Sequence, residues 1–425
     1  MTDGPDSRYA WLRLSVALAL MTVGASGMYV VSVVLPTVQA EFGIDRSAAS
    51  MPYTMTMIGF GIGGILMGRL SDRFGVAVPA AIGAVGLGLG FAMAGAAPGL
   101  LLFGLAQGML IGLLGTSSTF SPLVADTTLW FEKRRGLAVA ICASGNYLGG
   151  ALWPPIAQHF IETVGWRTTY LGIGLFCVAT MLPLSLLLRR RPPGFGATGA
   201  AAKTAHRAPG AWIGPVDRPL GLSKTTLQWL LNVSGVACCV AMAMPQVHIV
   251  AYCTDLGFGA ARGAEMLSVM LGTGIVSRLV SGWISDRIGG LRTLLLGAVL
   301  QGLALLLFIP FDGLVSLYLV SALFGLFQGG IVPSYALIVR EHFAPAEAGV
   351  RVGQVVTATL LGMALGGWMS GAIFDVTGSY DAAFLNGIGW NLVTVTIATL
   401  LLRRAGPLNR APAAPPPGTA TPSTV

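Results

Sequence analysis

Charged side chains are scarce in this chain of 425 residues. Asp, Glu, Lys and Arg make up 10% of the sequence, and hydrophobic residues make up 54%, whereas a soluble globular domain carries about 25% charged residues. This shortage excludes an ordinary soluble domain. The net charge is +8, which in a soluble protein could suggest nucleic acid as a partner. Here the cations lie in the gaps between long apolar runs, so their placement argues against nucleic acid. The composition predicts an all-α integral membrane protein whose partner is the lipid bilayer.

Cysteine and histidine are rare as well, with five and four residues. The cysteines fall in or beside apolar segments and show no C-x-x-C spacing, so neither a disulfide framework nor a metal site is indicated. An enzyme would need nucleophiles, carboxylates or metal ligands clustered at one depth, and the sequence contains no such cluster. We therefore predict no cofactor, no metal and no enzymatic activity.

Uncharged runs long enough to cross a membrane fill most of the chain, since a spanning helix needs about 20 apolar residues. The third and fourth runs are predicted to form a hairpin at Ala97-Pro98-Gly99, and Pro154, Pro155 and Pro245 are predicted to bend or break their helices. Twelve helices are predicted, at residues 12–38, 50–68, 76–97, 99–124, 136–160, 168–188, 225–252, 264–284, 292–311, 313–338, 351–374 and 382–402.

Lysine and arginine gather on one side of these predicted helices. All of the 25 cations lie on the side that carries both chain ends, except Arg46, Arg167, Arg262 and Arg278. The positive-inside rule then predicts an inner or plasma membrane protein with both termini in the cytoplasm. The predicted divisions are a cytoplasmic N-terminal segment (1–11), a six-helix bundle (12–188), a cytoplasmic linker rich in Arg, Pro and Gly (189–224), a second six-helix bundle (225–404) and a disordered tail (405–425).

A short motif occurs twice at equivalent places. It follows the second predicted helix and recurs after the eighth, 214 residues later, and the pair Gly149-Gly150 recurs as Gly366-Gly367 at nearly the same offset. A constant offset indicates two related halves. The repeated positions are Gly68, Asp72, Arg73 and Gly75 in the first copy and Gly282, Asp286, Arg287 and Gly289 in the second.

The repeated motif resembles the signature G-x-L-a-D-r-x-G-r-k of the major facilitator superfamily. The first copy lacks the basic end, since Val76 and Ala77 follow Gly75, whereas the second copy is followed by Arg292. The resemblance implies the major facilitator fold, with twelve transmembrane helices in two pseudo-symmetric six-helix bundles, and transport by alternating access. It also implies that the motif pairs acidic and basic groups with a neighbouring helix end and helps to hold the outward-facing state.

Within that superfamily the chain resembles the monocarboxylate transporters and their oxalate/formate-antiporter-like bacterial relatives. The similarity rests on Leu35-Pro36 after helix one, on Trp130-Phe131-Glu-Lys-Arg-Arg135-Gly at helix five, on Pro245-x-x-His248-x-x-x-Tyr252 in helix seven, and on an arginine midway along helix eight. It implies a small carboxylate as substrate.

Arg278 is that arginine and the main candidate for a substrate-binding residue. It lies eight residues before Asp286, which places it about 12 Å inside a core about 30 Å thick. A guanidinium at this depth costs about 2.5–3.5 kcal/mol on insertion scales and usually serves a pathway, a counter-ion or an anionic ligand. Because no Asp or Glu is expected at that depth, we predict that Arg278 anchors a carboxylate. The alternative is a structural role, snorkelling or bonding to helix carbonyls.

The chain departs from the family in its other charges. The animal monocarboxylate transporters place an Asp one turn before this arginine, where the present chain has Gly274, and their helix-one lysine is also absent. Helix eleven lacks the lysine that the oxalate/formate antiporter pattern requires. A single buried cation suits a monoanion better than a dicarboxylate.

His248 in helix seven is the second candidate, for substrate binding or for a proton relay, because histidine titrates near neutral pH. The alternative is a packing histidine whose hydrogen bonds are satisfied. The remaining substrate-binding candidates are weakly polar, and most of them are expected to be helix-packing residues. They are Tyr29, Ser117, Thr119, Asn146 and Tyr335.

The sequence therefore predicts a secondary active transporter of small monocarboxylates, lactate- or pyruvate-like, coupled to protons. One alternative is an exporter of amphipathic compounds, which would tolerate the loss of Arg278, and another is a dicarboxylate/monocarboxylate antiporter. The glycine strings Gly59–Gly64 and Gly83–Gly90 are interpreted as close-packing helix faces and not as nucleotide fingerprints, since no strand precedes them.

Overall fold

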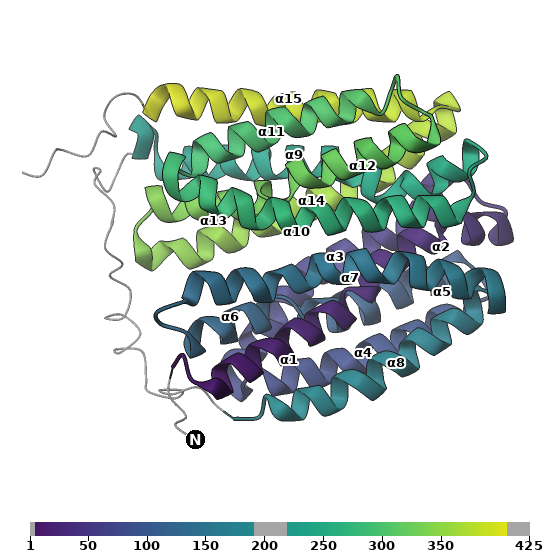
Figure 1. Cartoon of the computed structure of the whole chain (residues 1–425), viewed down its shortest axis with the longest axis horizontal. Coiled ribbons are helices and arrows are strands. Elements are labelled where there is room, and N and C mark those ends of the chain that lie inside the picture. The colour runs from purple at the N-terminus through teal and green to yellow at the C-terminus, as the bar shows by residue number, and fades with distance from the viewer. Residues whose placement is uncertain (1–4, 191–218, 406–425) are drawn as a thin grey trace, which may run out of the picture.

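Every regular element of the described chain is a helix (Figure 1). The structure is a computed structural model that describes residues 5–190 and 219–405. Residues 1–4 of the predicted N-terminal segment, 191–218 of the predicted linker and 406–425 of the predicted tail lie outside the described residues.

The helices form two bundles that lie side by side along their length (Figure 1). The first contains α1 (Arg8–Gly24), α2 (Ser26–Phe42), α3 (Arg46–Phe74), α4 (Ala77–Gly95), α5 (Leu100–Leu105), η1 (Ala106–Thr116), α6 (Ser121–Trp130), α7 (Arg135–Val164) and α8 (Trp166–Leu187). The second contains the short 3-10 turn η2 (Pro219–Gly221), α9 (Lys224–Asp255), α10 (Ala260–Ile288), α11 (Gly290–Leu307), α12 (Leu314–Gln328), α13 (Ile331–His342), α14 (Pro345–Thr377) and α15 (Tyr380–Ala405).

Twelve stretches of helix correspond to the twelve predicted spans. Eleven of them are long and apolar enough to cross a membrane, and α3 completes the set. α3 is less hydrophobic because glycine, serine and threonine occupy many of its positions. The predicted hairpin is confirmed, since α4 ends at Gly95 and α5 begins at Leu100. The prediction of an all-α membrane protein with twelve spans is therefore confirmed.

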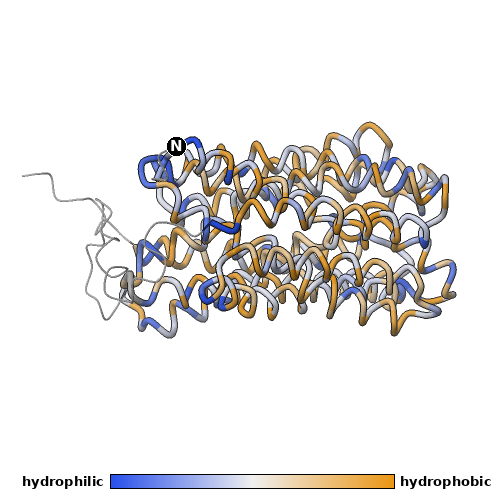
Figure 2. The backbone as a smooth tube through the Cα atoms, turned by 90° about the horizontal axis from the view of Figure 1, so that it is seen from below, coloured by the Kyte–Doolittle hydropathy of each residue, from blue (hydrophilic) through white to orange (hydrophobic). Residues whose placement is uncertain are grey.

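The outer faces of the bundles are hydrophobic. Leu101, Leu175 and Val315 are each more than 70% exposed, a state that only lipid makes favourable over so many side chains. Figure 2 shows the hydrophilic backbone positions gathered mainly at the two ends of the helices. We call the end where α8 stops and α9 starts the linker end, and the opposite end, which carries Arg46 and Asp255, the far end.

The predicted prolines do not break their helices. α7 runs through Pro154 and Pro155, and α9 runs through Pro245. Pro155 has no N–H to bond the carbonyl of Ala151, four residues earlier. The hydroxyl of Ser268 on α10 donates to that carbonyl instead, so a neighbouring helix satisfies the freed oxygen.

The interruptions lie elsewhere, in three of the spans. The first span is interrupted at Ala25, the fourth at Phe120 and the tenth at Gly329-Gly330. The fourth and tenth spans occupy equivalent places in the two halves, so these two breaks follow the repeat that the sequence predicts. The fourth span also contains η1, eleven residues of π-helix, an unusually long run of a rare element.

Glycines let η1 pack closely on α3. A Cβ added to Gly59 would lie 2.1 Å from the carbonyl oxygen of Gly108, and one added to Gly63 would lie 2.1 Å from that of Leu113. In the second string, a Cβ on Gly83 would overlap the hydroxyl of Ser118. The interpretation of these strings as close-packing faces is confirmed at these positions.

Candidate functional site between the bundles

Arg278 reaches from the second bundle to the first. Its Nη1 donates to the backbone carbonyl of Ala143 on α7 at 3.0 Å, and its Cζ lies 4.3 Å from the centroid of the Tyr147 ring. Ala143 and Tyr147 are one turn apart on the same face of α7. α7 therefore holds the guanidinium at two points, while Nε is buried and has no partner among the described residues.

Two more of the predicted substrate-binding residues join Arg278 here. The hydroxyl of Tyr29 on α2 donates to Oδ1 of Asn146 at 2.9 Å, and Asn146 directly precedes Tyr147. A Cβ added to Gly150, three residues after Tyr147 on α7, would lie 2.8 Å from Cε2 of Tyr29. We call Tyr29, Asn146, Tyr147 and Arg278 the anchor cluster. Tyr147 was not predicted from the sequence.

Gly274 makes room for the ring of Tyr147. A Cβ on this glycine would lie 2.4 Å from Cε1 of Tyr147, which is closer than non-bonded carbons approach. Gly274 stands one turn before Arg278 on α10, the position at which the animal monocarboxylate transporters have Asp. In this chain an aromatic ring takes the space that a side chain at residue 274 would need.

Arg13 shows how an arginine of this protein binds a carboxylate. Its Nε and Nη2 donate to Oδ2 and Oδ1 of Asp126 at 2.8 and 2.9 Å. Its Nη1 donates to the carbonyl of Arg190 at 2.9 Å, and the Trp130 ring lies 4.9 Å from its Cζ. Asp126 on α6 is therefore already paired with Arg13.

Two other arginines, Arg167 and Arg351, also bind a carboxylate through the Nε/Nη2 edge of the guanidinium. Nε and Nη2 of Arg167 donate to Glu41 at 3.2 and 2.7 Å, and those of Arg351 donate to Glu347 at 2.9 and 2.7 Å. An aromatic ring covers the guanidinium in both cases, and the Nη1 of Arg167 bonds backbone carbonyls.

Arg278 repeats this arrangement without the acid. It has the carbonyl partner on Nη1 and the aromatic ring on its face, but none of the ion pairs among residues 5–190 and 219–405 includes it. Arg46 also has an unpaired Nε, but both of its Nη atoms bind Asp255. The Nε/Nη2 edge of Arg278 thus faces no carboxylate of the described residues.

His248 lies in the second bundle, closer to the far end. It is fully buried, with Nε2 2.8 Å from the carbonyl of Gly367 and Nδ1 3.1 Å from the hydroxyl of Tyr380. A carbonyl only accepts, so Nε2 carries the proton and Nδ1 accepts from Tyr380 in the neutral ring. Both nitrogens are occupied in this conformation, and the structure does not bring His248 into the anchor cluster.

The other three predicted substrate-binding residues are also buried among helices. The hydroxyls of Ser117 and Thr119 donate to carbonyls of their own span, and Thr119 packs against Gly24. The hydroxyl of Tyr335 lies 2.8 Å from that of Ser234 within the second bundle. These placements match the packing alternative that the sequence leaves open.

A polar network at the far end joins the bundles. The guanidinium of Arg46 donates to both oxygens of Asp255 at 3.1 Å and to the hydroxyl of Tyr380 at 2.7 Å. The carboxylate of Asp375 on α14 accepts from the backbone N–H groups of Arg46 and Ser47, each at 2.8 Å, and so caps the start of α3. We call Arg46, Asp255, Asp375 and Tyr380 the far-end latch. In the sequence, the latch was indicated by Arg46, a cation on the predicted outer side of the membrane, where cations are rare.

Among the residues that the structure describes, the linker end shows no comparable connection between the bundles. All hydrogen bonds between the bundles in the described residues lie between the far end and Arg278. The charged motif residues at the linker end are exposed and form no ion pair among the described residues, as expected when the linker ends of the bundles are apart. They are Asp72, Arg73, Asp286 and Arg287.

The motif glycines serve different purposes. Gly75 and Gly289 have φ of +86° and +84°, a region that favours glycine because it has no Cβ, and each ends its helix. A Cβ on Gly68 or Gly282 would meet nothing within 4 Å, so packing in this conformation does not require glycine there.

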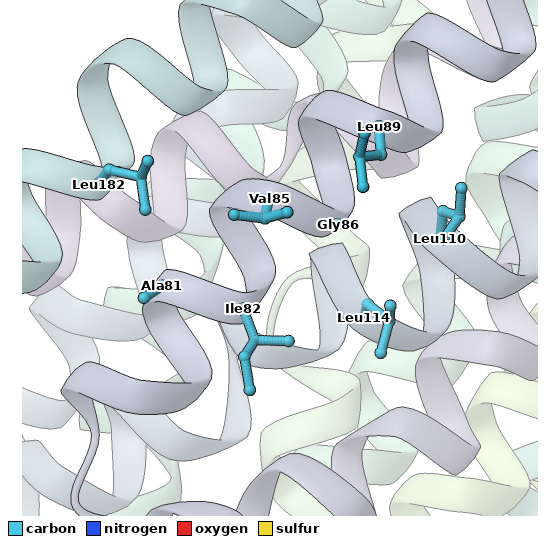
Figure 3. Close-up of a pocket in the computed structure, with 8 residues that line it drawn as sticks. All are labelled: Ala81, Ile82, Val85, Gly86, Leu89, Leu110, Leu114 and Leu182. Carbon is cyan, nitrogen blue, oxygen red and sulfur yellow. The ribbon is translucent and has the colours of Figure 1, made fainter.

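A separate hollow lies on the lipid-facing side of the first bundle. Its volume is about 340 Å³, and only apolar residues of α4, η1 and α8 line it, among them Val85, Leu114 and Leu182 (Figure 3). It offers no group to orient a polar substrate and does not include the anchor cluster. In the part of the chain that the structure describes, no three His, Cys, Asp or Glu residues lie together as a metal site would require.

Comparison with known proteins decides the family. The family model described as Major Facilitator Superfamily matches residues 16–319 and 237–424. The chain belongs to the major facilitator superfamily. The protein is therefore a membrane transporter and not an enzyme, as predicted, and the predicted fold class is confirmed.

Relatives within the superfamily carry different names. Monocarboxylate transporter 13 of Bos taurus is 29% identical over 324 residues, covering 74% of this chain and 71% of that protein. The agnestins efflux protein AgnL12 of Paecilomyces divaricatus is 24% identical over 368 residues, covering 86% and 81%. The crystal structure of the nucleoside transporter NupG superposes with a TM-score of 0.71 at 14% identity, covering 93% of this chain and 99% of that one, which supports the superfamily fold.

Proposed function

We propose that this transporter carries a small monocarboxylate, of the size of lactate or pyruvate, and binds its carboxylate at the Nε/Nη2 edge of Arg278. The observation that carries the proposal is the comparison among the arginines. Arg13, Arg167 and Arg351 each direct this edge at a carboxylate of the protein. Arg278 has the same kind of support and no acidic partner among the described residues, so a substrate carboxylate completes the arrangement.

The surroundings of Arg278 favour a monoanion. The described contacts of the anchor cluster include no second cation, and its other polar groups are the hydroxyls of Tyr29 and Tyr147 and the amide of Asn146. These groups are neutral and suit a carbonyl or hydroxyl oxygen on a short acid. A dicarboxylate would leave its second charge unpaired in a low-dielectric site, which is costly. The name of the bovine relative points to the same substrate class.

Alternating access is part of the proposal. The far-end latch closes one side of the anchor cluster, and the opposite closed state would release the latch and bring the linker ends together. We assign the repeated motif, with Asp72 and Asp286, to contacts of that second state. From the cation distribution we place the linker end, and with it both termini, on the cytoplasmic side of the inner or plasma membrane.

Proton symport is the proposed coupling. No carboxylate is within bonding reach of Arg278 among the described residues, so the proton travels through a neutral relay or with the substrate. His248, linked through Tyr380 to Arg46, connects a titratable ring to the latch. We therefore assign His248 to the proton relay, and not to direct contact with the substrate, in the state that the structure describes.

Uptake into proteoliposomes tests the proposal. A labelled panel of lactate, pyruvate, a longer aliphatic acid, oxalate and a neutral analogue is supplied with an imposed inward proton gradient. We expect accumulation of one or more monoacids by the wild type, loss of it when a protonophore is added, and loss of it in Arg278→Ala. Arg278→Lys should recover little, since an ammonium lacks the two-point edge.

Arg262→Ala is the matched control, because Arg262 is an exposed arginine on the same helix, α10, and pairs with Glu265 on the surface. It should transport like the wild type. Equal uptake by Arg278→Ala and the wild type, or no movement of any acid, would reject the carboxylate site. The efflux relative AgnL12 then directs the next screen to amphipathic compounds.

A further inference from the structure

We infer that Tyr147 is a positioning and specificity-determining residue, whose ring takes the place of a counter-ion beside Arg278 and aims the Nε/Nη2 edge at the substrate. The inference rests on the proposed carboxylate site and adds a residue from the opposite bundle to it.

The first step concerns charge. The face of an aromatic ring attracts a cation through its quadrupole but carries no net charge. The Tyr147 ring at 4.3 Å therefore stabilises the guanidinium without neutralising it. An acid in the same place would form an ion pair and compete with the substrate carboxylate for the same donors.

The second step concerns direction. The Ala143 carbonyl fixes Nη1, and the Tyr147 ring fixes one face of the guanidinium plane. With Nη1 and one face held, the in-plane Nε/Nη2 edge is a side of the guanidinium that no described residue occupies. A carboxylate binds best in that plane, through two parallel hydrogen bonds.

The third step concerns the partner position. Gly274 is needed because the ring lies where its Cβ would be, 2.4 Å from Cε1 and 2.6 Å from Cδ1. Residues 147 and 274 are thus a matched pair contributed by α7 and α10. Since these helices belong to different bundles, the aim of Arg278 depends on how the bundles lie against each other. Substrate affinity and bundle position are coupled through this pair.

The test is a set of variants at the two positions, with uptake of labelled pyruvate and lactate into proteoliposomes as the readout. Tyr147→Phe keeps the ring and should keep the wild-type KM. Tyr147→Leu removes the π face and should raise KM about tenfold, the size expected for a partly desolvated cation–π contact, with a smaller change in kcat. Gly274→Ala should raise KM in the same way, because its Cβ displaces the ring.

The pair is tested by a double-mutant cycle. Gly274→Ala should have little further effect on KM in a Tyr147→Ala background, since the clash requires the ring. The thermal unfolding temperature without substrate should show the same non-additivity. Tyr170→Leu is the control for a buried tyrosine away from the cluster, since Tyr170 is fully buried in the first bundle beside Gln107. It should lower the unfolding temperature and leave KM unchanged.

Two results would overturn the inference in different ways. If the wild type transports pyruvate or lactate in an Arg278-dependent manner while Tyr147→Leu retains the wild-type KM, the positioning role is wrong and the carboxylate site stands. If neither acid is transported by the wild type, the carboxylate site fails and the role of Tyr147 fails with it.

Discussion

Arg46 and Asp255 face each other across the boundary between the bundles, with Nη1 and Nη2 of the arginine 3.1 Å from Oδ2 and Oδ1 of the aspartate. Arg46 lies on α3 of the first bundle and Asp255 on α9 of the second. A contact of this kind exists only while the far ends are together. It therefore helps to hold the far ends of the two bundles together.

Removing the latch should open the far end. In Arg46→Ala the bonds to Asp255 and Tyr380 are lost, and hydrogen bonds to charged groups contribute about 1.5–3 kcal/mol each. We expect the equilibrium to shift at least about tenfold towards the far-end-open state. The measurement is labelling of Thr54→Cys by a membrane-impermeant maleimide, because Thr54 bonds the carbonyl of Ala364 in the other bundle and becomes accessible on opening.

The five native cysteines are all buried. Any labelling of these cysteines by the maleimide is measured on the protein without the Thr54→Cys substitution and subtracted. Arg262→Ala should leave the labelling rate unchanged, since it breaks only an ion pair within α10. Slower or unchanged labelling in Arg46→Ala would show that the latch does not hold the far end closed.

His248→Phe should weaken the latch without changing the substrate preference. The imidazole accepts from Tyr380, which in turn accepts from Arg46, so its loss frees one side of Tyr380. We expect faster labelling at Thr54→Cys than in the wild type, in the same direction as Arg46→Ala. The ratio of lactate to pyruvate KM, measured in parallel, should not change. A change in that ratio would instead assign His248 to substrate binding.

The buried pair of Arg13 and Asp126 should be important for stability. Their side chains are 3% and 8% exposed, and removal of one partner from a buried pair costs about 3–5 kcal/mol. Asp126→Asn and Arg13→Met should each lower the thermal unfolding temperature in detergent. The double variant should recover much of the loss, because no uncompensated charge remains. If both single variants unfold like the wild type, the pair is not a major source of stability.

The glycine face of α3 should tolerate alanine at some positions and not at others. Gly59→Ala would bring a Cβ within 2.1 Å of a backbone oxygen of η1, and backbone cannot move as a side chain can. Such overpacking costs about 1–3 kcal/mol, which should appear as a lower unfolding temperature. Gly61→Ala, whose Cβ would meet its nearest neighbour at 3.6 Å, is the control two residues away. Equal stability of the two variants would contradict the packing.

Helix spans and their order could be predicted from the sequence because both depend on local properties. About 20 apolar residues in a row cross a bilayer wherever they occur, and the linker composition and repeated motif are visible in the chain itself. The breaks in the spans were harder to predict. Pro155 leaves α7 intact because Ser268, more than a hundred residues away, satisfies the freed carbonyl, whereas Pro122 lies in the first turn of α6, directly after the break at Phe120.

The sequence by itself determined that one arginine lies deep in the membrane without an acid of its own, because charge and depth can be counted along the chain. Only the tertiary structure decided which polar groups meet it. Ala143 and Tyr147 contact Arg278, and Tyr29 bonds Asn146 beside Tyr147. His248 and Tyr335 instead form contacts within the second bundle and towards the far end. The rotation of each helix about its axis is set by packing against helices far away in sequence. A pattern within one helix therefore cannot fix whether a polar side chain faces the substrate pathway or a neighbouring helix.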